Sequence, residues 1–185
     1  MNFKIGIKEV VAMGIGTALF VVLTNVQIPL IVVPNTALQP RMAILAFLAA
    51  VFGPVVGAVV GLAGHAIGDA LFYGSVWWSW VIPEGVVGLA IGLFAGKFAV
   101  KEGCFISGKN IILFNVVQIV VNAVAWILCA PVLDILIFAE PANKVFAQGA
   151  FAFLGNIVII GILGTILLVA YSKITGGSNN LQVEE

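Results

Sequence analysis

The stretch FGPVVGAVVGLAGHAIGDALFYGSVWWSWVI, residues 52–82, embeds a small group of polar and aromatic side chains in a long apolar sequence. It contains His65, the only histidine, and three of the four tryptophans. FGP at residues 52–54 is typical of a tight turn. The apolar run after it has about the 20 residues that a helix needs to cross a bilayer. We therefore predict a membrane helix over residues 54–72, then an aromatic loop and a further helix.

The composition extends this prediction to the whole chain. Of the 185 residues, 62% are hydrophobic and 9% are charged, and the mean hydropathy is +1.21. A soluble domain carries about 25% charged residues. We therefore predict an all-α integral membrane protein. Its net charge of zero argues against a nucleic-acid partner, because nothing would neutralise the phosphates.

The apolar runs and their breaks predict a single domain of six membrane helices over residues 1–175. The helices are expected at residues 9–27, 39–52, 54–72, 78–98, 110–137 and 145–172. The tail, residues 176–185, is polar and expected to be disordered. Three prolines between residues 29 and 40 break the chain after the first helix. Irregular backbone at this depth must be buried in protein or line a cavity.

The basic residues predict the orientation of these helices. With the N-terminus inside, six lysines fall on the cytoplasmic side, whereas Arg41 and Lys144 fall outside. The six are Lys4, Lys8, Lys97, Lys101, Lys109 and Lys173. Both termini are therefore expected in the cytoplasm. The proline-rich loop and the tryptophans then lie at the outer surface.

His65 and Asp69 are four residues apart and share one helix face. Ionisable groups inside a membrane are costly and indicate function. The pair either braces the helix through a hydrogen bond or lines a polar cavity that opens outward. No third member of a catalytic triad is evident, and one histidine with scattered acids is a poor metal site. We therefore expect neither catalytic residues nor a metal.

Trp77, Trp78 and Trp80 allow two interpretations. Tryptophan is enriched at membrane interfaces, where it anchors helices. At least one of the three could instead stack on a flat ligand. Glu84 follows them inside the next helix, where it could meet Arg41 or a cationic ligand.

The fifth and sixth predicted helices carry amides. Asn115, Gln118, Asn122 and Trp126 recur at helical spacing on one face. Such amides commonly join membrane helices through hydrogen bonds. Asn122 and Trp126 lie at a depth from which they could also face a pocket, and Asn156 would lie near the floor of that pocket.

The first helix carries two interleaved pairs of small residues, Ala12 with Gly16 and Gly14 with Ala18. Small residues at this spacing let another helix approach closely. The approaching helix belongs either to this chain or to a partner membrane protein.

The segment GCFISGKN, residues 103–110, matches part of a phosphate-binding loop. Asn110 stands where such a loop needs Ser or Thr to hold magnesium, and the segment joins two membrane helices. We therefore expect no ATPase and no cofactor in this chain.

Several strings resemble the S components of energy-coupling factor (ECF) transporters, in the branch assigned to hydroxymethylpyrimidine near the riboflavin-type members. These strings are KEVVAMGIGTALF at 8–20, PNT at 34–36, the opening stretch at 52–82 and GLAIGLF at 88–94. S components are small membrane proteins of bacterial cytoplasmic membranes that bind a vitamin or vitamin precursor. The resemblance covers residues 8–96 well, whereas the last two helices match mainly in hydropathy.

The resemblance implies a function and a site. The chain would capture hydroxymethylpyrimidine, pyridoxine or a similar heterocycle outside the cell for ATP-driven uptake. It would dock through Ala12, Gly14, Gly16 and Ala18 on a transmembrane coupling subunit (the T component) paired with two ATPases, which use the ATP. The positions implied to bind substrate are Asn35, Thr36, Glu84, Asn122, Trp126 and Asn156, with His65, Asp69 and Trp78 as support.

Two other hypotheses remain. A stand-alone proton-coupled carrier would use Asp69 and Glu84 as its coupling sites. A membrane enzyme would use His65 and Asp69, but it lacks both a nucleophile and a metal site.

Overall fold

The computed structural model describes residues 5–29 and 36–181, with side chains described as far as residue 176. The first half contains α1 (Ile7–Leu23), α2 (Arg41–Phe52), α3 (Pro54–Phe72), α4 (Trp78–Leu93) and the short α5 (Ala95–Phe98). The second half contains α6 (Gly108–Asn122), α7 (Ala130–Phe138), α8 (Ala142–Ile159) and α9 (Thr165–Leu181). The all-α prediction is confirmed for the described residues, apart from one short antiparallel hairpin of β1 (Ile28–Pro29) and β2 (Ala37–Leu38).

Two π-helical segments join the α-helices of the second half in pairs. The segment η1 (Ala123–Cys129) joins α6 to α7, and η2 (Ile160–Gly164) joins α8 to α9. The result is two long helices, residues 108–138 and 142–176, each long and apolar enough to cross a membrane. The helix at 54–72 is the third such span among the described residues, and α2 and α4 are shorter apolar helices.

Most predicted helix boundaries agree with the structure, and α3 has the predicted range. The preceding turn is built on Gly53, whose φ of 95° is accessible to glycine at little cost. The fourth predicted helix is divided at Phe94 into α4 and α5. The last helix continues to Leu181, so residues 176–181 are helical, where a disordered tail was expected.

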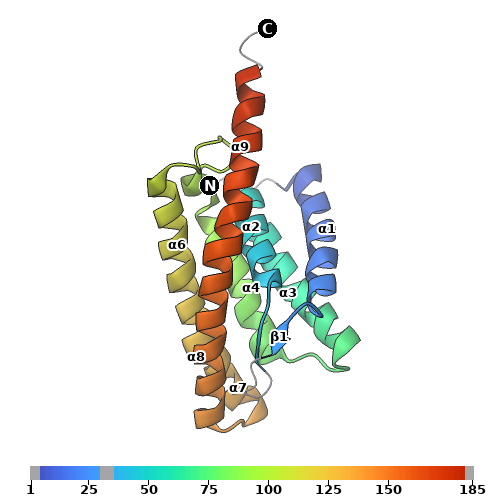
Figure 1. Ribbon diagram of the computed structural model, residues 1–185. Coiled ribbons are helices and arrows are strands. Elements are labelled where there is room, and N and C mark those ends of the chain that lie inside the picture. Colours follow the sequence, from blue (N-terminus) through green and yellow to red (C-terminus); the bar gives the residue numbers. More distant parts are fainter. Residues whose placement is uncertain (1–4, 30–35, 182–185) are drawn as a thin grey trace.

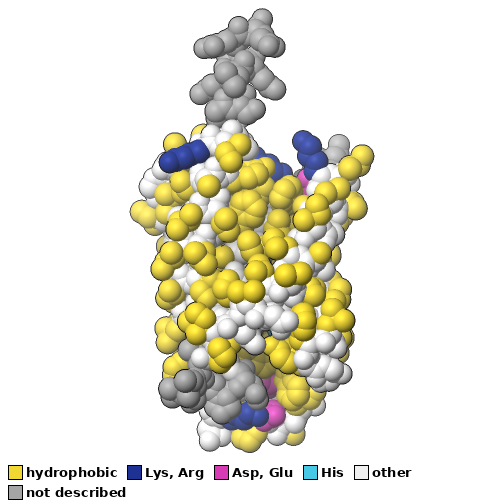
Figure 2. Space-filling view, turned by 45° about the vertical axis from the view of Figure 1, so that its right-hand side comes forward, with side chains coloured by type: hydrophobic (Ala, Val, Ile, Leu, Met, Phe, Trp, Pro, Cys, Tyr) yellow, Lys and Arg dark blue, Asp and Glu magenta, His cyan; other side chains and the backbone are white. Residues whose placement is uncertain are grey.

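The helices pack side by side as an elongated bundle (Figure 1). The β-hairpin, the end of α3 and α7 lie at one end, whereas the start of α1 and the end of α9 lie at the other. Hydrophobic side chains cover the middle of the surface seen in Figure 2, and the charged side chains gather at its two ends. This is the distribution expected of a protein whose middle contacts lipid.

The segment that resembled a phosphate-binding loop is a turn before α6. The Ser107 hydroxyl accepts a hydrogen bond from the backbone N–H of Asn110 at 3.3 Å and so caps the N-terminus of that helix.

The small residues of α1 divide between two faces. Ala12 and Gly16 are buried, and a Cβ on Gly16 would lie 2.5 Å from Leu48 of α2 and 3.1 Å from Val60 of α3. Ala12 and Gly16 therefore hold α1 against its own bundle, as the intrachain alternative expected, and their docking on a partner stays a prediction. Gly14 and Ala18 are exposed, and a Cβ on Gly14 would meet nothing within 4 Å.

Helices α3 and α4 contact each other closely through facing glycines. A Cβ on Gly57 would collide with the backbone carbonyl of Gly88, and a Cβ on Gly88 with that of Gly57. One turn further, a Cβ on Gly61 would lie 2.7 Å from the carbonyl oxygen of Glu84. Neither backbone can yield without moving a whole helix, so these glycines set the distance between α3 and α4.

We predict that Gly57→Ala lowers the stability of the protein by about 1–3 kcal/mol, because the added methyl group forces two helix backbones apart. Gly14→Ala is the matched control, and it should leave stability unchanged or raise it by up to about 1 kcal/mol through helix propensity. Thermal unfolding in detergent, followed by tryptophan fluorescence, measures both. Equal melting temperatures for the two variants would contradict the glycine contact.

Candidate functional site

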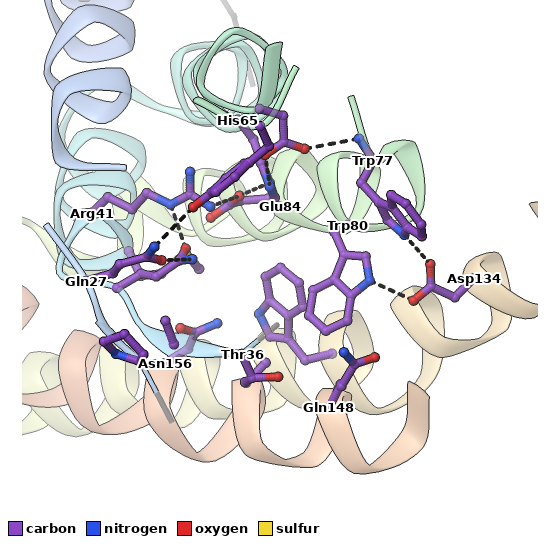
Figure 3. A pocket seen from close by; sticks show the side chains of 18 of the residues that line it. Gln27, Thr36, Arg41, His65, Trp77, Trp80, Glu84, Asp134, Gln148 and Asn156 are labelled. Carbon is purple, nitrogen blue, oxygen red and sulfur yellow. Dashed lines mark hydrogen bonds and ion pairs between the residues drawn. The ribbon is translucent and has the colours of Figure 1, made fainter. Parts of the chain in front are cut away.

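A cavity of about 700 Å³ lies at the hairpin end of the bundle. Its walls come from the β-hairpin and from α2, α3, α4, η1, α7 and α8 (Figure 3). This volume falls within the range of about 300–1,000 Å³ that is typical of small-molecule sites.

A group of buried charges forms one wall. Arg41 of α2 and Glu84 of α4 are 2% and 1% exposed, and Arg41 Nη2 lies 3.4 Å from Glu84 Oε2. His65 of α3 contacts the same Oε2 through Nδ1, and its Nε2 lies 3.4 Å from Asp69 Oδ1. Of the two partners considered for Glu84, the structure therefore supplies Arg41. Glu84 Oε1 is buried and accepts no hydrogen bond from the described residues.

Arg41 also ties the hairpin to the helices. Its Nε donates to Gln39 Oε1 at 2.7 Å, and its Nη1 donates to Thr24 Oγ1 at 2.9 Å. The amide of Gln39 donates in turn to Gln27 at 3.5 Å, and Gln27 donates to the Tyr73 hydroxyl at 3.1 Å. The residues on both sides of the hairpin are thus fixed to α2 and to the end of α3.

Asp134 of α7 organises the tryptophans. Its two carboxylate oxygens accept hydrogen bonds from Trp77 Nε1 and Trp80 Nε1, each at 2.7 Å, and Ser79 Oγ donates to Oδ1 as well. The backbone N–H of Trp77 donates to Asp69 Oδ2 at 3.0 Å. The start of α4 is therefore held between α3 and α7.

Two tryptophans from different helices form an aromatic wall. The rings of Trp80 and Trp126 lie 5.4 Å apart between centroids and are inclined by 33°. Trp126 Nε1 donates to Asn122 Oδ1 at 3.0 Å, and Asn122 Nδ2 donates to the carbonyl of Gln118 at 2.8 Å. Asn122 is fully buried and does not line the cavity. It was expected to face substrate, but its amide is used to orient Trp126.

The structure brings most of the residues singled out from the sequence to this cavity. Those that line it are Thr36, Glu84, Trp126, Asn156, His65 and Asp69. Trp78 does not, and it is 50% exposed. The reason is that α4 begins at Trp78, and its helical phase turns Trp80 inward instead. Asn35 lies outside the described residues.

Sequence reasoning missed several lining residues. It did not assign Tyr73, Asp134, Gln27, Gln39 or Gln148 to the site, although all five line the cavity. Asp134 and Gln148 carried a usable signal, since each is a polar residue near the outer end of an apolar predicted helix.

This arrangement can bind a small molecule. It offers aromatic rings, amides and charged groups around a partly enclosed space. Among the described residues, no three His, Cys, Asp or Glu side chains are placed to hold a metal. The fold and the site define a membrane protein that binds a small molecule.

Comparison with known proteins identifies the family. The sequence profile described as "ECF-type riboflavin transporter, S component" matches residues 4–173, and the chain belongs to this family. It is 51% identical over 177 residues to a UPF0397 protein of Exiguobacterium sp., covering 96% of each chain. It is 48% identical over 176 residues to a UPF0397 protein of Streptococcus gordonii, covering 95% of this chain and 94% of the relative.

The chain is therefore a substrate-binding S component of an ECF transporter, as its sequence motifs indicated. It is a multi-pass protein of the bacterial cell membrane and a transport protein rather than an enzyme. Membership of the family implies partnership with an ECF T component and ATPases.

We predict that Asp134→Asn disorders the tryptophan wall. An amide has one acceptor oxygen where the carboxylate has two, and its N–H groups would face an indole N–H. The cost should be about 1.5–3 kcal/mol for each charge-assisted hydrogen bond lost. Near-ultraviolet circular dichroism should show a weaker tryptophan signal.

Glu140→Gln is the control, because Glu140 also lines the cavity but pairs only with Lys144, at 2.7 Å, and contacts no tryptophan. A tryptophan signal in Asp134→Asn equal to that of the control would contradict the role of Asp134.

Proposed function

We propose that this S component captures a small aromatic heterocycle, a vitamin or vitamin precursor such as hydroxymethylpyrimidine or pyridoxine, for ATP-driven uptake. The observation that carries the proposal is the pair of facing tryptophans, Trp80 and Trp126, inside a cavity of about 700 Å³. Two indole rings from different helices present the flat apolar surface on which an aromatic ring stacks.

The remaining walls suit the polar edge of such a ring. Gln27, Gln148 and Asn156 bring amides to the cavity, and Thr36 and Tyr73 bring hydroxyl groups. Amides and hydroxyls donate and accept hydrogen bonds, so they match the ring nitrogens and hydroxymethyl groups of these vitamins. Several heterocyclic vitamins and precursors carry these polar groups. The lining therefore supports this substrate class more strongly than any one vitamin.

We further propose six membrane-spanning helices with both termini in the cytoplasm. The start of α1 and the end of α9 lie at the end of the bundle opposite the cavity, which supports an outward-facing cavity (Figure 1). The 12 residues of α2 span about 18 Å, too short to cross a bilayer alone. In this proposal the hairpin strands before α2, whose Pro29 and Ala37 line the cavity, extend that span.

Uptake in this proposal depends on ATP hydrolysis by the partner ATPases. The alternative, a proton-coupled carrier, would need Asp69 and Glu84 to exchange protons. Both carboxylates already have partners. Asp69 contacts His65 and the backbone N–H of Trp77, and Glu84 contacts Arg41 and His65. Ion gradients alone should therefore drive no uptake by the isolated chain in liposomes, and such uptake would contradict the coupling to ATP.

The exposed face of α1 is the proposed docking surface for the T component. It presents Gly14 and Ala18 between exposed aliphatic side chains such as Ile15 and Val22. A smooth face of this kind lets a second membrane helix approach closely.

We predict that Ala18→Leu reduces co-purification of the chain with the T component and the ATPases by about tenfold or more, because the larger side chain holds the partner helix away. Ala150→Leu is the matched control, since Ala150 is also an exposed helical alanine but lies on α8. Ligand binding by the isolated chain should be equal in both variants. Undiminished complex formation by Ala18→Leu would remove this face from the interface.

We predict saturable binding of at least one such heterocycle, at one molecule per chain, when hydroxymethylpyrimidine, pyridoxine, thiamine and riboflavin are titrated against tryptophan fluorescence. Trp126→Leu should weaken that binding by about tenfold through loss of ring stacking. Trp78→Leu is the control and should bind normally, because Trp78 does not line the cavity. Absence of saturable binding to all four compounds would overturn the proposed substrate class.

A further inference from the structure

We propose that the cavity selects a planar nitrogen heterocycle that presents an amino or cationic N–H group to Glu84, and that it rejects anionic ligands. This inference rests on the proposed function and adds the charge and the orientation of the ligand.

The first observation is the state of the Glu84 carboxylate. Its Oε2 is shared by Arg41 and His65, whereas Oε1 accepts no hydrogen bond from the described residues. Glu84 is 1% exposed and lines the cavity. A buried carboxylate oxygen without a donor is costly, and a ligand N–H at this position removes that cost.

The second observation is the balance of charge in the cavity wall. The wall contains three deeply buried carboxylates, those of Asp69, Glu84 and Asp134, and one buried guanidinium, that of Arg41. The wall remains net negative even when His65 is protonated. The sequence of residues 30–35, which the structure does not describe, contains no charged side chain. Charges interact strongly where water is scarce, so this wall attracts a cation and repels an anion.

The other carboxylates of the wall already have donors. Asp134 accepts from Trp77, Ser79 and Trp80, and Asp69 contacts His65 and the backbone of Trp77. At the rim, Glu140 and Lys144 neutralise each other. Of these carboxylates, Glu84 is the one that lines the cavity with a buried oxygen lacking a donor among the described residues.

The position of Glu84 also orients the ligand. Trp80 and Glu84 are four residues apart on α4 and share one helix face. A ring stacked on the Trp80 and Trp126 wall thus has its edge toward Glu84, where an exocyclic amino group donates to Oε1.

A metal ion is a weaker candidate for this negative charge. Among the described residues, no group of three His, Cys, Asp or Glu side chains is placed to coordinate one. The aromatic wall also favours an organic ligand, because a nitrogen cation gains from indole faces.

The test compares ligands that differ in one group, against the full chain in detergent by isothermal titration calorimetry. The probes are 4-amino-5-hydroxymethyl-2-methylpyrimidine, the same ring without its amino group, and its phosphate ester. We expect the amino compound to bind about 10- to 100-fold more tightly than the deamino compound. The phosphate ester should bind more weakly still. Thiamine, a cationic aminopyrimidine, is added as a larger probe.

Glu84→Gln should weaken binding of the amino compound by about 10- to 100-fold and abolish its advantage over the deamino compound. Glu102→Gln is the matched control, because Glu102 is an exposed carboxylate that does not line the cavity. If Glu84→Gln fails to fold, the comparison of the amino compound, the deamino compound and the phosphate ester on the unaltered chain still tests the proposal.

The outcomes separate the two proposals. Equal binding of the amino and deamino compounds, or tight binding of the phosphate ester, overturns the role of Glu84. The proposed function, binding of a small aromatic heterocycle, would still stand. Absence of binding to every heterocycle tested overturns the proposed function and this inference with it.

Discussion

The contact of His65 and Arg41 with a single oxygen of Glu84 is the interaction on which the rest of the structure depends. It joins α2, α3 and α4 at one point inside the bundle, in a protein whose outer surface is apolar. Charges removed from water are tolerated only when they are paired, so this contact constrains the positions of all three helices. Because Arg41 also holds Gln39, the constraint extends to the hairpin strands that line the cavity.

The glycines of α3 and α4 make this contact possible. Since Gly57 and Gly61 have no side chains, the α4 backbone lies directly against α3, and His65, one turn beyond Gly61, reaches Glu84. The same helix α4 carries Trp80, which faces Trp126, and Asp134 fixes the indole groups of Trp77 and Trp80. The close contact of α3 with α4 and the ligand-sized cavity beside it thus share the residues His65 and Glu84.

Much of the fold could be predicted from the sequence, because apolar runs and proline or glycine breaks mark the helices directly. The range of α3 was obtained in this way, and the spacing of His65 and Asp69 predicted that they share a face. The direction of a side chain is harder to predict in a membrane protein, because both the core and the lipid-facing surface are apolar. For this reason Trp78 was preferred to Trp80, although one lies on the surface and the other in the cavity.

The fifth predicted helix shows a second limit. Its polar residues were placed on one face by assuming a regular α-helix, but the segment from Ala123 to Cys129 is π-helical. A π-helix closes its hydrogen bonds one residue later, which changes the direction of every side chain beyond it. The inward direction of Asp134 therefore did not follow from the spacing. The pairing of Arg41 with Glu84 was foreseen only as one of two possibilities, since the sequence gives no distance between helices.

The central claim is that a net negative, tryptophan-walled cavity holds an amino-substituted nitrogen heterocycle. Mass spectrometry of the small molecule that co-purifies with the chain from bacterial membranes tests it most directly. The account predicts one nitrogen heterocycle per chain, uncharged or cationic and carrying an amino group. Recovery of an anionic compound, such as a phosphate ester, in stoichiometric amount would contradict it.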